Sequence, residues 1–159
     1  MIVERTEHPS WLSNAYLVAD GAGGHGVLID GNGVAGQLLE RVERDGIRVT
    51  HVLVTHEHRD HVDGVEELAE RLGAELVRPR DLGDGESVRT GELEIRALAT
   101  PGHARDHLAF LIDGTDCLTG DALFRRTVGG TRGGGPTGFA DLRRSIMEKL
   151  LTLPPETRI

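Results

Sequence analysis

The sequence has a single cysteine, few aromatic residues and no long apolar run, and each scarcity excludes a class of protein. Cys117 has no partner for a disulfide within the chain, and its apolar setting favours a buried, reduced thiol over a nucleophile or metal ligand. No apolar run approaches the roughly 20 residues that cross a bilayer, which argues against a membrane-spanning helix. The N-terminus, M-I-V-E-R-T-E-H-P, lacks the basic start and apolar stretch of a secretion signal, so the sequence predicts a cytoplasmic protein.

Positive charge is also in short supply. The formal net charge is −8 and aromatic residues make up 3% of the chain, which together argue against binding to nucleic acid or to a membrane surface. The length of 159 residues, with 38% hydrophobic and 28% charged residues, is typical of one soluble globular domain that spans residues 1–159. No pattern in the sequence indicates an oligomeric state.

Strand-like and helix-like patterns alternate along the chain, which predicts a mixed α/β architecture. Helices are predicted at 34–45, ending before Gly46, and at 142–153. A further helix is predicted to begin at Asp63, which can serve as its N-cap, with Glu66 three residues later. Strands are predicted at 15–19, 27–29, 49–55, 74–77 and 92–99, and in a hairpin of 108–112 and 117–119 with a two-residue turn at Asp113-Gly114.

The densest polar segment is T-H-E-H-R-D-H-V-D-G, residues 55–64, which starts where the most strand-like run of the chain ends. In extended chain, alternate side chains share a face, so His56 and His58 can bind one ion together. Asp60 and His61 fall on the turn into the next helix, where a second ion can be held. A lone histidine would be read as an incidental surface residue, but three histidines and two aspartates within eight residues predict a metal site.

Two further candidate ligands follow other predicted strands. His103 comes after the strand 92–99 through the turn T-P-G, and Asp121 comes after the strand 117–119 through a glycine. Each therefore lies just beyond the carboxyl end of a strand, where open α/β sheets gather their ligand groups. Taken alone, either residue would be read as part of a turn.

The motifs T-H-E-H-R-D-H-V-D-G, T-P-G-H and T-G-D, in this order, resemble the metal motifs of the metallo-β-lactamase superfamily, and most closely those of its hydroxyacylglutathione hydrolase (glyoxalase II)-like members. The resemblance implies an α/β fold, namely a four-layer αββα sandwich, and two zinc ions, with iron or manganese as alternatives for the same ligand types. It implies a ligand set in which His56, His58 and His103 bind one metal, Asp60 and His61 bind a second, and Asp121 bridges both.

The sequence departs from the family pattern in one respect. The family has a further histidine, usually in a P-G-H-G turn after the next strand, whereas this sequence stops at Glu156-Thr157-Arg158-Ile159, which resembles the start of that strand. We therefore expect that the C-terminal part of the domain, with its final strand and helix, is missing from the sequence. One protein ligand of the second metal is then absent, so that site is expected to be partly occupied.

For each of the other polar candidates the sequence allows two interpretations. Arg125, Arg126 and Arg132 lie in the glycine-rich stretch after Asp121, where they either bind an anionic substrate or pair with the protein's own carboxylates. His107 either supports the site or caps a strand, and the second reading is favoured. Asp30 follows a predicted strand and either hydrogen-bonds the metal loop or serves in a turn.

The motifs predict a hydrolase that uses a metal-bound hydroxide on a thioester or another small carbonyl ester, with Asp60 orienting the hydroxide or accepting its proton. Alternatives on the same fold are a phosphodiesterase or ribonuclease, which the acidic composition disfavours, and a mono-iron persulfide dioxygenase. A non-catalytic metal-binding protein is the alternative from another class. The expected partner is an anionic small molecule.

Overall fold

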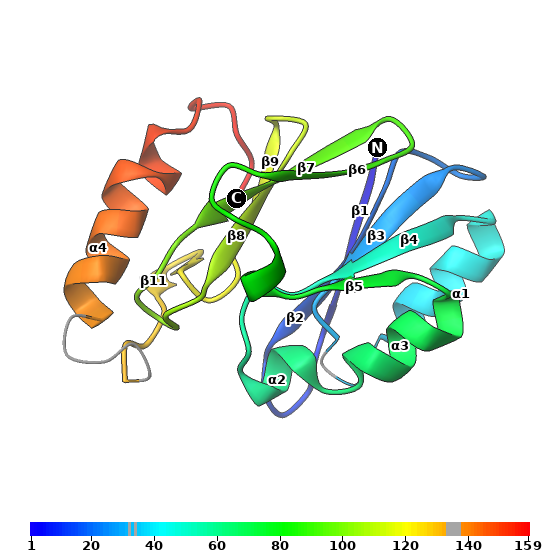
Figure 1. The fold of residues 1–159 in the computed structure, drawn as a ribbon, viewed down its shortest axis with the longest axis horizontal. Coiled ribbons are helices and arrows are strands. Elements are labelled where there is room, and N and C mark those ends of the chain that lie inside the picture. Colours follow the sequence, from blue (N-terminus) through cyan, green and yellow to red (C-terminus); the bar gives the residue numbers. More distant parts are fainter. Residues whose placement is uncertain (32, 34, 133–137) are drawn as a thin grey trace. The chain divides into compact units, whose positions relative to one another are not determined.

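A computed structural model describes residues 1–31, 33, 35–132 and 138–159, and it divides the chain into two compact units (Figure 1). The first unit contains Met1–Val54, His58–Arg78 and Arg89–Leu93, and the second contains Thr55–Glu57, Pro79–Val88 and Glu94–Ile159. The assignment of the whole chain to one domain stays a prediction.

The first unit is built on a five-stranded sheet with the order β1-β2-β3-β4-β5. The first three strands pair antiparallel, whereas β3, β4 and β5 pair parallel. The helices α1 and α3 place their apolar sides in one core with the strands, where Leu38 and Leu39 of α1 and Leu68 of α3 are buried with Leu17 and Val52. The bounds are β1 Ile2–Glu7, β2 Asn14–Ala19, β3 His25–Ile29, α1 Gly36–Asp45, β4 Arg48–Leu53, α2 Arg59–Val62, α3 Val65–Leu72 and β5 Glu75–Val77.

The second unit is built around a sheet with the order β6-β7-β8-β9, in which β7, β8 and β9 pair antiparallel. The helix α4 packs Leu142 and Ile146 against Ala109 and Leu111 of β8, which buries one face of this sheet. The bounds are the 3-10 turn η1 Pro79–Asp81, β6 Ser87–Thr90, β7 Leu93–Ala99, β8 Leu108–Ile112, β9 Asp116–Leu118, β10 Leu123–Phe124, β11 Thr127–Val128, α4 Gly138–Glu148 and the 3-10 turn η2 Leu150–Thr152.

The predicted strands are all present, with shifts of a few residues at their ends. The predicted strand 49–55 ends early, at Leu53 of β4, and the helix predicted over 34–45 is α1, although Val34 lies outside the described residues. Four strands and α2 were not predicted, because β1 (I-V-E-R-T-E) ends in four polar residues in a row and the others have at most four residues: these are β1, β6, β10, β11 and α2.

Three detailed predictions were wrong. Asp63 does not cap α3: it ends α2, and the N-cap of α3 is Gly64 in a left-handed conformation that a glycine adopts without strain. The β8–β9 hairpin has three linking residues, because Asp116 pairs with Ile112 and Thr115 therefore joins Asp113 and Gly114 in the turn. The last helix ends at Glu148 and continues as η2.

The C-terminal residues start a further pairing with β9. Arg158 forms a parallel bridge with Asp116, and the N–H of Cys117 donates to the Arg158 carbonyl at 2.8 Å. No helix in the described part of the chain is long and apolar enough to cross a membrane.

Candidate metal centre

His56 lies in extended chain three residues after β4 and is fully buried. Its backbone is fixed from the preceding residue, because the Thr55 carbonyl accepts the Leu108 N–H at 2.8 Å. The Thr55 hydroxyl also contacts Nδ1 of His56 at 3.0 Å, which leaves Nε2 as the nitrogen that can coordinate an ion. The chain stays extended as far as His58, which is the N-cap of α2 with φ −70° and ψ 144°. This extended path matches the geometry expected for two histidines that bind one ion.

His103 is oriented by the glycine-rich segment that follows Asp121. Its Nδ1 donates to the Gly130 carbonyl at 2.7 Å, which places the lone pair on Nε2. That Nε2 lies 3.5 Å from Oδ2 of Asp121. The approach depends on Gly129, where an added Cβ would overlap the Asp121 carbonyl and lie 3.2 Å from Nδ1 of His103.

Residues of α4 fix the position of the loop that carries His103. The Ser145 hydroxyl donates to the Pro101 carbonyl at 2.8 Å, and a side chain at Gly102 would overlap the backbone of Leu142. The turn Thr100-Pro101-Gly102 therefore fixes the position of His103 by close packing as well as by chain direction.

His107 connects the two loops of the second unit that carry candidate ligands. Its Nε2 accepts the backbone N–H of Asp121 at 3.1 Å, so Nδ1 carries the proton and donates to the Thr100 hydroxyl at 2.8 Å. The ring is buried, with its centroid 5.0 Å from that of His56. The reading of His107 as a strand cap therefore misses its contact with Asp121, because that contact joins residues 14 positions apart.

In the first unit, His61 is fixed by Asp30. The Asp30 carboxylate accepts a hydrogen bond from Nδ1 of His61 at 2.8 Å, and both side chains are almost completely buried. Asp30 follows β3 with a positive φ of 61°, and its bond to the metal loop is one of the two interpretations that its sequence position left open. Asp60 lies beside His61, with Oδ2 3.6 Å from its Nε2.

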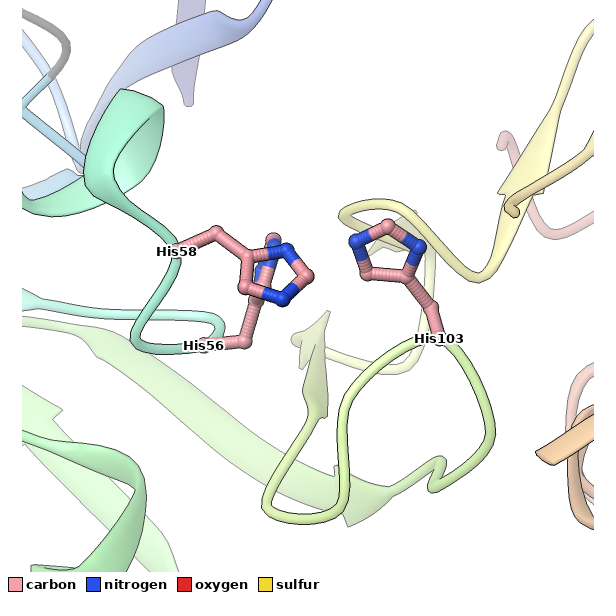
Figure 2. A group of neighbouring side chains, drawn as sticks. All are labelled: His56, His58 and His103. Atoms are coloured by element: carbon pink, nitrogen blue, oxygen red, sulfur yellow. The ribbon is translucent and has the colours of Figure 1, made fainter. Parts of the chain in front are cut away.

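Two groups of side chains satisfy the geometry for holding a metal ion, with potential ligand atoms all within 4.8 Å of one another. His56, His58 and His103 form the first group (Figure 2), where the rings of His56 and His103 meet edge to face at 4.8 Å. His56, His61 and Asp121 form the second. Asp60, the remaining predicted ligand, belongs to neither group.

The donors fit a divalent metal of borderline softness. Imidazole nitrogens with a carboxylate are the ligands that zinc and iron prefer. In each of His56, His61 and His103, Nδ1 contacts a hydroxyl, carboxylate or carbonyl oxygen, which is the support that metal-binding histidines normally have. The residues present therefore suit a metal site.

Other candidate residues lie outside this cluster. Arg125 and Arg126 form the exposed turn between β10 and β11, and Arg132 is also exposed, so their contact with a substrate stays a prediction. Cys117 is buried in β9, as predicted, and burial raises the pKa of its thiol to about 12. At neutral pH it is therefore a protonated core residue.

Comparisons with known proteins agree with this fold. Residues 9–84 match the family model described as the metallo-beta-lactamase superfamily. The chain is 34% identical to a hydroxyacylglutathione hydrolase from Bradyrhizobium sp. (strain ORS 278), over 91% of this chain and 59% of that protein, so it spans a little over half the length of this relative.

Two solved structures extend the likeness over nearly the whole chain. ETHE1 from Myxococcus xanthus is 33% identical with a TM-score of 0.87, and the match covers 99% of this chain and 73% of that one. The protein TTHA1623, solved in a di-iron-bound form, is 30% identical with a TM-score of 0.74 over 97% and 88% of the two chains. With its five-stranded and four-stranded sheets and its His/Asp cluster, the chain belongs to the metallo-β-lactamase superfamily.

Proposed function

We propose that the protein is a metal-dependent hydrolase that acts on a thioester, or on another small carbonyl ester. The observation that carries this proposal is the partly buried, oriented donor cluster around His56, in a chain whose curated relatives include hydroxyacylglutathione hydrolases. Because the chain spans 59% of the relative from Bradyrhizobium, the activity of the whole relative is a proposal for this chain.

The proposed ligand set follows the motifs. His56, His58 and His103 would hold one ion, while Asp60, His61 and Asp121 would hold a second, with Asp121 shared between them. Zinc is the proposed metal, with iron or manganese as the alternatives. When bound there, such an ion supplies a Lewis acid for the carbonyl and lowers the pKa of a coordinated water to roughly 7.

The chain's own groups would handle the proton and the orientation. The Asp60 side chain is 33% exposed, so its carboxylate can reach both the site and solvent and is proposed to accept the proton released by the attacking water. A thioester suits this arrangement because a thiolate leaves without much help from a general acid. We propose that the exposed side chains of Arg125, Arg126 and Arg132 contribute to binding an anionic substrate tail.

The test is hydrolysis of a 2-hydroxyacylglutathione thioester by protein loaded separately with zinc, iron or manganese, with the metal content measured by elemental analysis. Activity should follow the metal content and should disappear in His58→Ala and in Asp121→Ala. Arg143→Gln, on the exposed side of α4, is the control and should retain activity. Full activity in either ligand variant, or in metal-free protein, would refute the proposal.

A second candidate is oxidation of a persulfide by dioxygen at a single iron. It is favoured by the ligands that the second unit contains by itself, since His56, His103 and Asp121 are two histidines and one carboxylate, the set typical of non-haem iron oxygenases. Oxygen uptake by the iron-loaded protein with a persulfide, without thioester hydrolysis, would select this candidate.

A further inference from the structure

The turn between β1 and β2 presents an exposed aromatic platform. The His8 carbonyl accepts the Leu12 N–H at 2.9 Å, and Nδ1 of His8 accepts the N–H groups of Ser10 and Trp11 at 3.2 and 3.0 Å. The same imidazole stacks on the Trp11 indole, with 4.4 Å between centroids and 21° between planes. The indole is thus held in one orientation while 39% of the residue stays exposed.

A cation from the metal motif lies over this platform. The guanidinium carbon of Arg59 is 5.9 Å from the centroid of the Trp11 ring, within the range of a cation–π contact. Arg59 is exposed and is the first residue of α2, directly between His58 and Asp60. No ion pair of Arg59 with a carboxylate is found among the residues that the structure describes, although the chain carries 26 acidic residues.

This arrangement is suited to binding an anion. The aromatic ring attracts the guanidinium through its face and does not use its N–H donors, which remain able to bind both oxygens of a carboxylate. A guanidinium that is already oriented also loses less conformational freedom when it binds. By contrast, Arg125 and Arg126 lie on the exposed two-residue turn between β10 and β11.

We propose that Arg59, oriented by Trp11 and His8, binds a carboxylate of the substrate and makes the enzyme prefer carboxylate-bearing thioesters over neutral ones. This inference rests on the proposed hydrolase function. The proposed specificity residue lies within the metal motif, next to both His58 and Asp60. Binding of the substrate anion then does not depend on the arginines of the glycine-rich segment alone.

The first experiment compares two thioesters with the same acyl group, one of glutathione, which carries carboxylates, and one of N-acetylcysteamine, which is neutral. In Arg59→Gln, kcat/KM should fall about 10- to 100-fold for the glutathione thioester, the loss expected for one charge-assisted hydrogen-bonded contact, and stay within about twofold for the neutral one. Arg59→Lys should recover part of the difference. The control Arg143→Gln, which removes an exposed charge elsewhere, should leave kcat/KM unchanged for both thioesters. An equal fall for both thioesters in Arg59→Gln would overturn the inference.

The second experiment does not need activity, so it separates this inference from the proposed function. Trp11 is the only tryptophan of the chain, and its emission therefore reports on the surroundings of the indole, which include the Arg59 guanidinium. Titration of the metal-loaded protein with S-methylglutathione should give a saturable change in emission in the wild type and in Arg143→Gln, and no saturable change in Arg59→Gln. An unchanged response in Arg59→Gln, or none in the wild type, would overturn the inference even if thioesters are hydrolysed.

Discussion

The backbone N–H of Asp121 donates to Nε2 of His107 at 3.1 Å, so the residue proposed to join both ions is fixed through its main chain by a buried imidazole. The same ring donates from Nδ1 to the Thr100 hydroxyl, at the start of the turn that leads to His103. One side chain therefore sets the separation of two loops in the second unit, and both loops carry proposed ligands.

Replacing the buried His107 should weaken metal binding, although His107 is not itself a proposed ligand. In His107→Ala the Asp121 N–H and the Thr100 hydroxyl lose their partner, and we expect metal affinity to fall about 10- to 100-fold, as for other outer-shell groups. Competition titration with a chromophoric chelator measures this loss. His25→Ala, which replaces a half-buried histidine of β3, is the matched control, and equal affinities in the two variants would contradict the role given to His107.

Asp30 should be sensitive to the type of substitution. Asp30→Ala removes the acceptor for His61 and places alanine at a φ of 61°, so we expect a loss of about 2–4 kcal/mol in the free energy of unfolding. Asp30→Asn keeps an acceptor oxygen and tolerates positive φ, so its loss should be smaller. Denaturant unfolding of the metal-free proteins gives both values. Equal losses in Asp30→Ala and Asp30→Asn would contradict the roles given to the acceptor oxygen and to the positive φ.

Gly102 should not accept a side chain. Its φ is 140° and an added Cβ would overlap Leu142 of α4, so Gly102→Ala should cost about 1–3 kcal/mol and displace the His103 loop. Gly36→Ala is the control, because nothing lies within 4 Å of the new Cβ in α1 and a gain of about 0.5–1 kcal/mol is expected there. The midpoint temperature of thermal unfolding and the metal content should therefore both fall in Gly102→Ala, and neither should fall in Gly36→Ala.

The Asp116–Arg158 pair should make stability depend on pH in acid. Two hydrogen bonds of 2.7 Å from the Arg158 guanidinium hold the pKa of the Asp116 carboxyl below its ordinary value of 3.8. A carboxyl with a lowered folded pKa contributes stability above its unfolded pKa and loses that contribution as the pH falls through the folded pKa. Arg158→Ala should therefore be less stable than the wild type at pH 7 and nearly equal to it once Asp116 is protonated. A difference that does not change between pH 7 and pH 2 would exclude this linkage.

Much of the site could be predicted because its ligands follow strands with strong local patterns. His56 and His58 come after a β-branched run, and His103 and Asp121 come after strands that end at a glycine-containing turn, so local sequence already indicates where each ligand lies along the chain. The cap of α3 was predicted wrongly for a local reason too: Asp63 has the composition of an N-cap, but the short helix α2 ends there and Gly64 takes the position.

What could not be predicted are contacts between segments far apart in the sequence. The bond from Asp121 to His107 and the placement of Arg59 over Trp11 depend on how turns fold back, and neither turn has a periodic pattern that reveals it. The pairing of Asp30 with His61 was one of two interpretations of the sequence, and only the tertiary structure could select it.

Gly120 faces the same imidazole from the other side: an added Cβ would lie 2.8 Å from Nε2 of His107 and 3.1 Å from the Thr55 Cβ. The ring thus occupies the volume that any side chain at residue 120 would need. The glycine at 120 is thus part of what seats the imidazole: its missing side chain leaves the space from which Nε2 of His107 reaches the backbone N–H of Asp121.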